Sequence, residues 1–568
     1  MNNKIIIYDL IKLLFIRKKS LIAIFLCMLI TALISVSIPL ISQSIMDYGF
    51  ITKNFYIIVQ FTILIFTLHL CECFLKIVQE KNRLLISNEI ENTLNKNAFI
   101  HLIKLKIDYY NNKNMTDIIN ALNVDIQNIL IIAEESTFYI ISQILNMIGG
   151  VVGLLVISKK LSLLVICFIP LKIVASKKMS KKNQQNLKEF IEKNQAYNAW
   201  YGDTLGGVKE IKHYNIFNKK LEEFNFKINS VITARNKMDI LNRWNEVCNL
   251  FSVYFLIAII YIIAGKFVVD AEISIGGAFA FISYTTYVTT PITSILNIGY
   301  IISGVLPSAH RYYEFMNRAE EENRGKCKEI CHMDIVFRNV SFYYNNQKKV
   351  LSNINFTIKE GSKCAIIGRN GSGKSSIINL IIRLYHATKG EVIIDNKNIL
   401  TLDIDEYRKK ISLVSQKVYL FNSSIKENIC LYEDIKQSEI DQVIEDSGLT
   451  DFIREVTLDY KVGENGAKLS GGQKQKIALA RALVHDRPIL IFDEATSNTD
   501  VYLESHLNKL VETKLNNKTL IIITHRKEIL RKMDQIILIE NGEIVGEGDY
   551  KNLYLNNQKF QDIINSSE

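Results

Sequence analysis

Long apolar runs fill the first half of the chain, and short β-branched runs fill the second half. In the first half, six apolar stretches are long enough to cross a bilayer, which takes about 20 helical residues each. Because only Ser158, Lys159 and Lys160 separate the third stretch from the fourth, these two are expected to form a tight helical hairpin. The pattern predicts six transmembrane helices, near Leu21–Ile45, Phe55–Leu75, Phe138–Ile157, Leu161–Val174 with its flanks, Val247–Phe267 and Ile275–Val305.

Basic residues predict the side of the membrane on which each loop lies. The loops at about 76–125 and 172–246 carry seven and fifteen Lys or Arg residues, five more precede the first span, and the alternate loops hold four. Cytoplasmic loops are enriched in Lys and Arg. We therefore expect a multi-pass protein of the cell membrane whose two termini and two long loops are cytoplasmic.

The two long loops have helical character of their own. Helix-compatible stretches such as Asn88–Leu105 and Asn186–Tyr201 adjoin the spans. The membrane helices are therefore expected to extend far into the cytoplasm, an arrangement that suits a protein passing motion to a soluble domain.

The pattern changes after a charged linker, Glu320–Gly325. Short strands then alternate with helical segments, which is typical of an α/β fold with a largely parallel sheet. We expect a membrane domain at 1–320, a linker at 321–333 and an α/β domain at 334–568. The expected strands are Val350–Ile358, Lys363–Ile367, Glu391–Ile394, Ile411–Val414, Pro488–Phe492, Thr519–Ile523 and Gln535–Glu540.

Composition and charge narrow the class of protein. The 568 residues are 48% hydrophobic, which excludes an intrinsically disordered chain. The net charge of +10 arises in residues 1–330, which hold 36 basic and 26 acidic residues, whereas residues 331–568 hold 32 of each. A basic excess beside long apolar runs indicates a membrane partner and no nucleic acid.

Nine cysteines are too few, in a chain of this length, for a disulfide scaffold. The closest groups are Cys71 with Cys73, and Cys327 with Cys331 and His332. Neither group has a second ligand pair at a spacing suited to a metal. Reduced, structural cysteines are the better interpretation.

A phosphate-binding loop follows the expected strand Lys363–Ile367. The run Gly368–Ser375 fits G-x-x-x-x-G-K-[ST], and a helix is expected from Ser375 onward. Glycines let backbone N–H groups curl around phosphate oxygens, and the helix N-terminus adds partial positive charge. Lys374 is expected to reach the β- and γ-phosphates of ATP, and the Ser375 hydroxyl to bind Mg²⁺. The predicted ATP-binding residues of the loop are Gly368, Arg369, Asn370, Gly371, Ser372, Gly373, Lys374, Ser375 and Ser376.

A second apolar strand ends in two carboxylates, Asp493 and Glu494. Such an end is costly unless the carboxylates meet a metal or water. Asp493 is expected to hold Mg²⁺ and Glu494 to polarise the attacking water. A solvated strand end is the alternative, which the preceding phosphate loop disfavours.

The run Leu469–Gln473, Leu-Ser-Gly-Gly-Gln, resembles the signature of ATP-binding cassette (ABC) proteins. Six spans followed by one such cassette resemble an exporter half-transporter of that superfamily over nearly the whole chain. Val462–Gly466 resembles a motif of exporters, and Ser497–Asp500 resembles the D-loop. The resemblance implies catalytic roles for Glu494, His525 and Gln416, Mg²⁺ ligands Ser375, Gln416 and Asp493, adenine stacking on Tyr344, and nucleotide contacts from Ser470, Gly471, Gly472, Gln473 and Asp500.

The signature has a physical basis. Ser470 is an N-cap candidate for a helix over Gly471–His485, and the two glycines leave its first N–H groups unobstructed for an anion. In the family this helix end completes the ATP site of the opposite subunit, so the resemblance implies a dimer. Because Glu494 and the signature both keep the consensus, a homodimer is expected, and a heterodimer with a related half-transporter stays open.

Two further features bear on coupling. The D-loop reads Ser-Asn-Thr-Asp where the family usually has Ser-Ala-Leu-Asp, a departure that concerns coupling between sites and not turnover. By resemblance, the cytoplasmic loops contain a coupling helix near Tyr109–Asn114 and a second coupling segment at Asp203–Lys212.

The expected function is ATP-driven efflux by alternating access. An ATP-gated channel or sensor is the alternative, and the intact Glu494 disfavours it because gating needs binding more than turnover. An amphipathic drug-like molecule or a small peptide is favoured as substrate over a lipid, because no dense basic ring suits a lipid phosphate. Polar residues within the spans either line a cavity or bond between helices, and both interpretations stay open. These residues are His69, Glu72, Gln143, Asn146, Asn249 and Tyr284.

Overall fold

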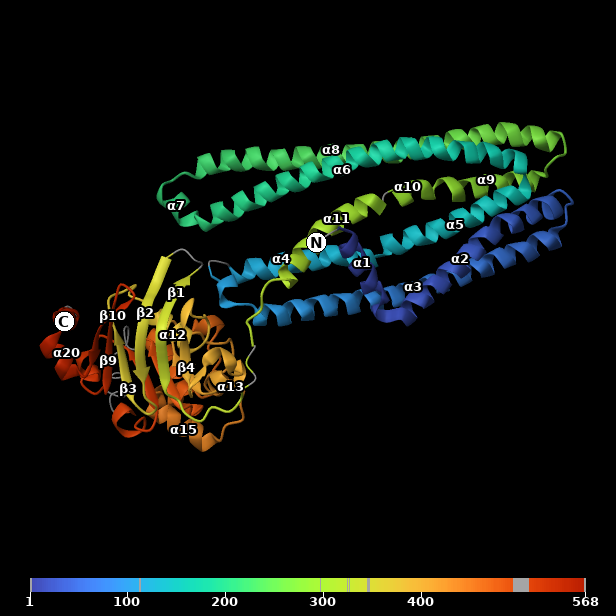
Figure 1. Cartoon of the computed structure of the whole chain (residues 1–568). Helices are drawn as coiled ribbons and strands as arrows, with labels where there is room; N and C mark the ends of the chain where they lie inside the picture. The colour runs from blue at the N-terminus through green and yellow to red at the C-terminus, as the bar shows by residue number, and fades with distance from the viewer. Residues whose placement is uncertain are drawn as a thin grey trace. The chain divides into compact units, whose positions relative to one another are not determined.

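Helices account for most of the chain as far as Met316, and two sheets with shorter helices follow (Figure 1). The computed structural model describes residues 3–111, 114–296, 298–323, 325, 327–344, 348–493 and 510–565. The chain divides into a helical unit, Met1–Leu105 with Tyr110–Glu320, and an α/β unit, Lys106–Tyr109 with Glu321–Glu568.

Long helices lie side by side in the helical unit (Figure 1). α6 packs along α8, α2 along α3, α5 along α9, and α4 along α11. The helices are α1 (Asn3–Leu14), α2 (Lys18–Ser44), α3 (Phe55–Lys104), α4 (Met115–Leu130), α5 (Glu135–Ile157), α6 (Lys159–Gly206), α7 (Val208–His213), α8 (Phe217–Val269), α9 (Ile275–Thr289), α10 (Pro291–Leu296) and α11 (Ile298–Met316).

The lengths of these helices confirm that the spans extend beyond the bilayer. α3, α6 and α8 have 50, 48 and 53 residues. At 1.5 Å per residue, each is about 70–80 Å long, more than twice the roughly 30 Å of hydrocarbon in a bilayer. The expected hairpin is also confirmed, because α5 ends at Ile157 and α6 begins at Lys159.

Four segments of the described chain are long and apolar enough to cross a membrane: Asn3–Phe50, Phe55–Lys104, Met115–Ile157 and Phe217–Val269. They contain four of the six expected spans. The fourth expected span is the start of α6, where lysines interrupt the apolar run, and the sixth is divided among α9, α10 and α11.

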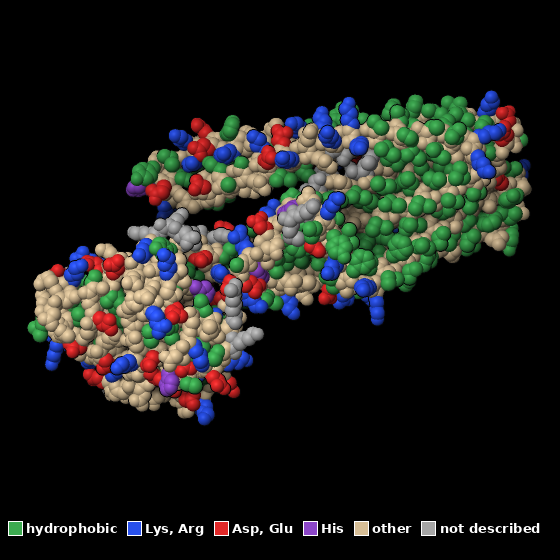
Figure 2. Space-filling model, viewed as in Figure 1, with side chains coloured by type: hydrophobic (Ala, Val, Ile, Leu, Met, Phe, Trp, Pro, Cys, Tyr) green, Lys and Arg blue, Asp and Glu red, His purple; other side chains and the backbone are tan. Residues whose placement is uncertain are grey.

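Hydrophobic side chains cover the part of the helical unit where α2, α5 and α9 lie, at the right of Figure 2. On α8, Phe251, Phe255 and Ile262 are 69%, 54% and 76% exposed. Side chains of this kind are stable in contact with lipid, which accounts for an apolar surface larger than a soluble domain carries.

The α/β unit contains a four-stranded antiparallel sheet of order β2-β1-β4-β5 and a six-stranded sheet of order β10-β9-β3-β8-β7-β6. In the larger sheet β9, β3, β8, β7 and β6 are parallel and β10 is antiparallel, which confirms the largely parallel core. The strands are β1 (Ile335–Tyr344), β2 (Lys348–Ile358), β3 (Lys363–Ile367), β4 (Lys389–Ile394), β5 (Lys397–Asn398), β6 (Ile411–Val414), β7 (Ile489–Asp493), β8 (Thr519–Ile523), β9 (Gln535–Glu540) and β10 (Glu543–Gly548).

Both faces of the parallel sheet are buried. On β3, Cys364 and Ile366 belong to one core cluster, whereas Ala365 and Ile367 belong to another. Parallel strands covered on both faces are apolar throughout instead of alternating. The helices that accompany the sheets are α12 (Lys374–Ile381), α13 (Ile404–Arg408), α14 (Ile425–Cys430), α15 (Gln437–Asp446), α16 (Thr450–Val456), α17 (Gly471–Val484), α19 (Lys527–Leu530), α20 (Tyr550–Asn556) and α21 (Gln558–Asn565).

The nine cysteines are free thiols, and the described residues contain no group of three or more His, Cys, Asp or Glu suited to a metal.

The segment expected to hold the first coupling helix contains a 3₁₀ turn at Ile107–Tyr109, so this turn lies slightly before the expected Tyr109–Asn114. This turn belongs to the α/β unit by its packing.

Candidate nucleotide-binding site

Four of the predicted site elements lie at one edge of the parallel sheet. The phosphate loop follows β3, His525 follows β8, Asp493 ends β7, and Gln416 follows β6. These strands are neighbours in the order β3-β8-β7-β6, and parallel strands bring their carboxyl ends to the same edge. The topology therefore gathers residues from four distant parts of the sequence.

Glycine is required at two positions of the phosphate loop by close approach. A Cβ at Gly368 would overlap the carbonyl oxygen of Ile539, and a Cβ at Gly373 would lie 2.6 Å from Leu351 Cδ2. Gly373 also has φ +109°, a conformation that L side chains rarely adopt. The loop is thereby held against β9 and β2, with its backbone placed where a ligand can approach it.

Lys374 and Ser375 begin α12 with opposite exposure. The Lys374 side chain is buried, and its Nζ donates to the carbonyl oxygens of Gly368 at 2.6 Å and Arg369 at 3.1 Å. Ser375 is exposed at the first turn of the helix. The ammonium thus bridges the loop from inside, whereas the Ser375 side chain is accessible at the start of the helix.

The loop also contains an orphaned polar atom. Ser372 Oγ is buried and has no hydrogen-bond partner among the described residues. A buried hydroxyl without a partner is costly, and a phosphate oxygen would satisfy it. This observation, with the glycine cradle, fits a bound nucleotide.

Tyr344 lies beside the phosphate loop at the end of β1. Its hydroxyl is 3.0 Å from Ser376 Oγ, and its ring makes edge contacts with Phe342 and Tyr385 at 4.6 Å and 5.0 Å between centroids. The residue predicted to stack on adenine is therefore anchored to α12.

The described donors at the sheet edge suit magnesium. A hydroxyl from Ser375, a carboxylate from Asp493 and an amide oxygen from Gln416 are hard oxygen ligands. Mg²⁺ commonly takes one or two such protein ligands and fills its remaining positions with water and phosphate. The donor set fits Mg²⁺, and Ser375, Gln416 and Asp493 would hold it. Glu494 and the D-loop, including Ser497 and Asp500, lie outside the described residues.

The signature forms the N-terminus of α17, as predicted. Ser470 is the N-cap: Gln473 N donates to Ser470 Oγ at 3.3 Å, and Ser470 N donates to Gln473 Oε1 at 2.8 Å. Apart from the adjoining residues and the backbone of the same helix, no described atom lies within 4 Å of a Cβ built at Gly471 or Gly472. The helix end is therefore open, and its free N–H groups and dipole favour an anion.

A separate cavity of about 880 Å³ lies in the helical unit, between α2, α3 and α5. Three of the six polar residues expected either to line a cavity or to bond between helices are in its lining: Glu72, Gln143 and Asn146. Tyr284 instead packs in a helical core and donates its hydroxyl to the Val36 carbonyl, so it bonds between helices. His69 contacts Glu72 at 3.4 Å from outside the lining.

The charged residues of this cavity beyond Glu72 were not anticipated from the sequence. Lys76, Glu80, Lys81 and Arg83 follow Glu72 along α3, and Glu135 begins α5. The sequence signal was available, because charges at 72, 76, 80 and 83 recur every three to four residues and so share one helix face.

The fold and site define an ATP-hydrolysing membrane transport protein in which one helical membrane unit precedes one P-loop ATPase unit. Two family models match it: one described as ABC transporter transmembrane region over residues 21–292, and one described as ABC transporter over residues 351–497. A Bacillus subtilis protein, named probable multidrug resistance ABC transporter ATP-binding/permease protein YheH, is 30% identical over 488 residues, which are 84% of this chain and 72% of that protein. The chain belongs to the ABC transporter family.

Other comparisons support the exporter architecture. An ATP-dependent lipid A-core flippase from Pseudoalteromonas translucida is 28% identical over 84% of this chain and 83% of that protein. A solved structure of a bacterial Atm1-family ABC exporter with ATP bound has the same fold, with a TM-score of 0.84, 20% identity and coverage of 97% of this chain and 98% of that one. These findings support ATP-driven export in general and confirm the half-transporter architecture.

Proposed function

We propose that this chain exports an amphipathic molecule or small peptide that carries both signs of charge, at the expense of ATP hydrolysis. The observation that carries the substrate class is the lining of the cavity between α2, α3 and α5. The lining contains three acidic and three basic side chains, alongside aliphatic and aromatic ones: Glu72, Glu80, Glu135, Lys76, Lys81 and Arg83, with Ile77, Leu84, Phe138 and Tyr139 among the others.

The charges of the cavity balance and partly pair. Lys76 Nζ lies 2.8 Å from Glu72 Oε1, and Arg83 donates to both carboxylate oxygens of Glu80 at 2.6 Å and 2.8 Å. A balanced lining gives little attraction to a ligand of one sign, whereas a ligand with both signs can exchange partners with such pairs. Asn146 Oδ1 is buried without a partner among the described residues and offers an acceptor for an amide or ammonium.

In the proposed ATPase cycle, two copies of the chain bind two ATP molecules. Glu494 orients and activates the water, His525 contacts the γ-phosphate, and Gln416 joins the metal site to the membrane domain. Mg²⁺, held by Ser375, Gln416 and Asp493, would neutralise developing phosphate charge. The α17 N-terminus, Ser470 to Gln473, closes on the ATP of the other copy, and the ATPase domain at 334–568 and both termini are cytoplasmic.

A lipid is the second candidate substrate. Relatives from Pseudoalteromonas translucida and Wigglesworthia glossinidia brevipalpis are named lipid A-core flippases, at 28% and 27% identity over more than four fifths of this chain. The balanced charge of the cavity favours a zwitterionic ligand over a multiply anionic one.

The test is ATPase stimulation of the full chain in liposomes by three compounds: a zwitterionic hydrophobic tetrapeptide, a cationic amphiphilic dye and a lipid A preparation. We expect the tetrapeptide to stimulate most strongly, and Glu72→Gln to raise its half-maximal concentration by roughly tenfold, the loss of about 1.4 kcal/mol of binding. Glu272→Gln is the matched control, because Glu272 forms an exposed ion pair with Lys160 outside the cavity, at 2.8 Å. Stimulation by lipid A alone, or equal effects of the two variants, would overturn the substrate assignment.

A further inference from the structure

The chain that follows the helical unit is bound to the α/β unit by hydrogen bonds of its backbone and of the Asn323 side chain. We call the described residues Glu321–Asn323, Gly325 and Cys327 the linker strap. Asn323 Oδ1 accepts from Ile404 N at 3.1 Å, and Cys327 O accepts from Asp403 N at 2.9 Å.

Gly325 shows how closely the strap is held. A Cβ at this position would overlap the backbone carbonyl of Leu402, so no side chain fits between them. The strap beside it forms a parallel bridge, Cys327 to Leu402. The segment is therefore a docked part of the α/β unit and not a free tether.

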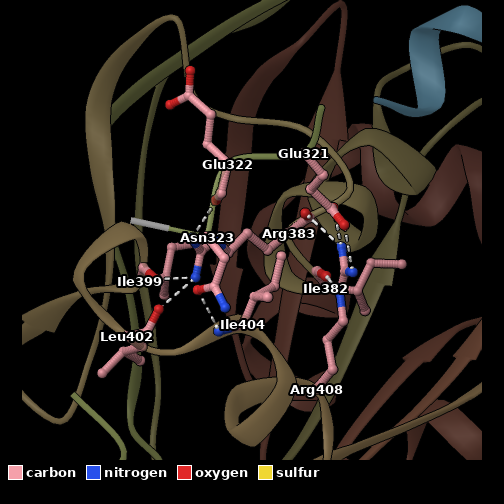
Figure 3. A network of polar contacts seen from close by, with 9 residues as sticks. All are labelled: Glu321, Glu322, Asn323, Ile382, Arg383, Ile399, Leu402, Ile404 and Arg408. Atoms are coloured by element: carbon pink, nitrogen blue, oxygen red, sulfur yellow. Dashed lines mark hydrogen bonds and ion pairs between the residues drawn. The ribbon is translucent and has the colours of Figure 1, made fainter. Parts of the chain in front are cut away.

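Two arginines fasten the strap (Figure 3). Arg383 is 1% exposed and donates from Nη1 to the carbonyl oxygens of Ile399 at 3.0 Å and Leu402 at 2.7 Å, and from Nη2 to the carbonyl oxygen of Glu322 at 3.1 Å. One planar guanidinium thus joins the strap to the turn over 399–402. Its fixed fork of donors makes the arrangement sensitive to the relative position of the two segments.

Arg408 joins the strap to a third segment. Its Nη1 donates to Glu321 Oε2 at 2.9 Å, and its Nη2 contacts the other carboxylate oxygen, forming a bidentate pair. The same side chain donates to the carbonyl oxygens of Ile382 at 3.2 Å and Arg383 at 2.9 Å (Figure 3). The carboxylate of the strap is thereby fixed to the two residues that directly follow α12.

The position of these contacts relates them to nucleotide binding. α12 begins at Lys374, in the phosphate loop, and Arg383 stands two residues after its last residue, Ile381. The helix has eight residues and is about 12 Å long. α12 is short and mostly buried, and Arg383 follows its C-cap, Ile382, directly, so we expect a displacement at the phosphate-binding end to reach Arg383.

We propose that Arg383 and Arg408 are positioning residues that convey nucleotide-driven movement of α12 to the linker strap, and so to the end of α11 with which the strap is continuous. This route depends on the proposed function only in that ATP binds the phosphate loop. It differs from the route through Gln416, because it follows the covalent connection between the two units.

The test uses amide hydrogen exchange of the full chain in lipid nanodiscs, with and without Mg²⁺ and the non-hydrolysable analogue AMP-PNP. In the parent, AMP-PNP should slow exchange in peptides covering 321–329. In Glu321→Gln and Arg408→Lys, which remove the charge or the bidentate geometry while keeping size, this nucleotide-dependent slowing should fall by roughly threefold or more, since exchange reports local opening. Affinity for AMP-PNP should stay within about twofold of the parent value, because neither residue touches the phosphate loop.

The matched control is a second Arg–Glu pair in the same unit, Arg338 with Glu391, at 3.0 Å. Arg338→Lys and Glu391→Gln should respond to AMP-PNP like the parent. A merely structural role would raise exchange equally with and without nucleotide, and that result, or an unchanged response in Glu321→Gln, would overturn the proposal. Failure of AMP-PNP to bind the parent would instead refute the nucleotide site, and failure of every compound to stimulate ATPase would refute the substrate class alone.

Discussion

The open N-terminus of α17 allows a substitution, Ser470→Asp, that should preserve the stability of the helix and lower ATPase activity. Ser470 is exposed, and its hydroxyl caps the helix by accepting from Gln473 N at 3.3 Å. Asn and Asp are as good N-caps as Ser, so Ser470→Asn and Ser470→Asp should both keep the helix. Ser470→Asp should gain about 0.3–1 kcal/mol with the helix dipole, whereas Ser470→Ala should lose about 1 kcal/mol with the cap.

The most stabilising variant, Ser470→Asp, should be poor in catalysis if this helix end meets the γ-phosphate of ATP on a second copy. Two unit charges of like sign 4 Å apart repel by about 4 kcal/mol at an effective dielectric constant near 20. A third of that energy already corresponds to about tenfold in rate. Ser470→Asp should therefore lose at least roughly tenfold in ATPase, while Ser470→Asn stays within about threefold of the parent.

The assay is phosphate release by the full chain in nanodiscs at saturating Mg·ATP, with thermal unfolding measured on the same samples. Added salt should recover part of the activity of Ser470→Asp, because exposed charges are screened. Parent-level ATPase in Ser470→Asp would refute the reasoning, as would a loss that Ser470→Asn shares.

Three further predictions concern the same unit. Gly368→Ala should weaken binding of a fluorescent ATP analogue by roughly tenfold or more, because its Cβ would overlap the Ile539 carbonyl, whereas Gly206→Ala, with open space around it, should leave binding unchanged. Glu494→Gln should retain Mg·ATP yet hydrolyse it at least about a hundredfold more slowly, since it loses the general base; rapid phosphate release in this variant would remove Glu494 from that role. Burial lowers the pKa of His485, so the unfolded chain binds the proton more readily than the folded chain. The contribution of neutral His485 to the free energy of unfolding should be fully present above about pH 6.5 and should fall below that pH. The slope of melting temperature against pH should therefore flatten in His485→Gln.

Much of the α/β fold could be predicted because its central strands are apolar on both faces. Lys363–Ile367, Ile411–Val414 and Thr519–Ile523 have the expected bounds. β10, Glu543–Gly548, was not anticipated, since a half-exposed edge strand with two glycines and two glutamates has no hydrophobic period. α1 was also missed, because a twelve-residue amphipathic helix beside a long span does not stand out by hydropathy.

The contacts of the α/β unit likewise divide into those that the sequence predicts and those that it does not. Contiguous motifs such as Gly368–Ser375 and Leu469–Gln473 were predictable, because each requires its residue types within one loop or one helix end. The strap contacts were not, since Arg383 and Arg408 meet their partners 16 to 87 positions away in the sequence, mostly through backbone carbonyls that no residue type announces. The linker was expected at 321–333 from its charge alone, and its docking is a property of the folded unit.

The packing of α17 explains why a charge placed at its N-terminus should affect the ATP site. One side of the helix, at Ile477 and Ala480, packs in a hydrophobic cluster with residues of α14 and α15. Leu469, directly before the N-cap, belongs to the same cluster. The other side, at Ala478 and Leu479, packs in the cluster that covers the parallel sheet. Close-packed interiors transmit displacement instead of absorbing it. A charge placed on the N-cap is therefore held by a helix wedged between both cores, and the chain cannot relieve the repulsion by moving that helix end without disturbing the strands that carry the phosphate loop and Asp493.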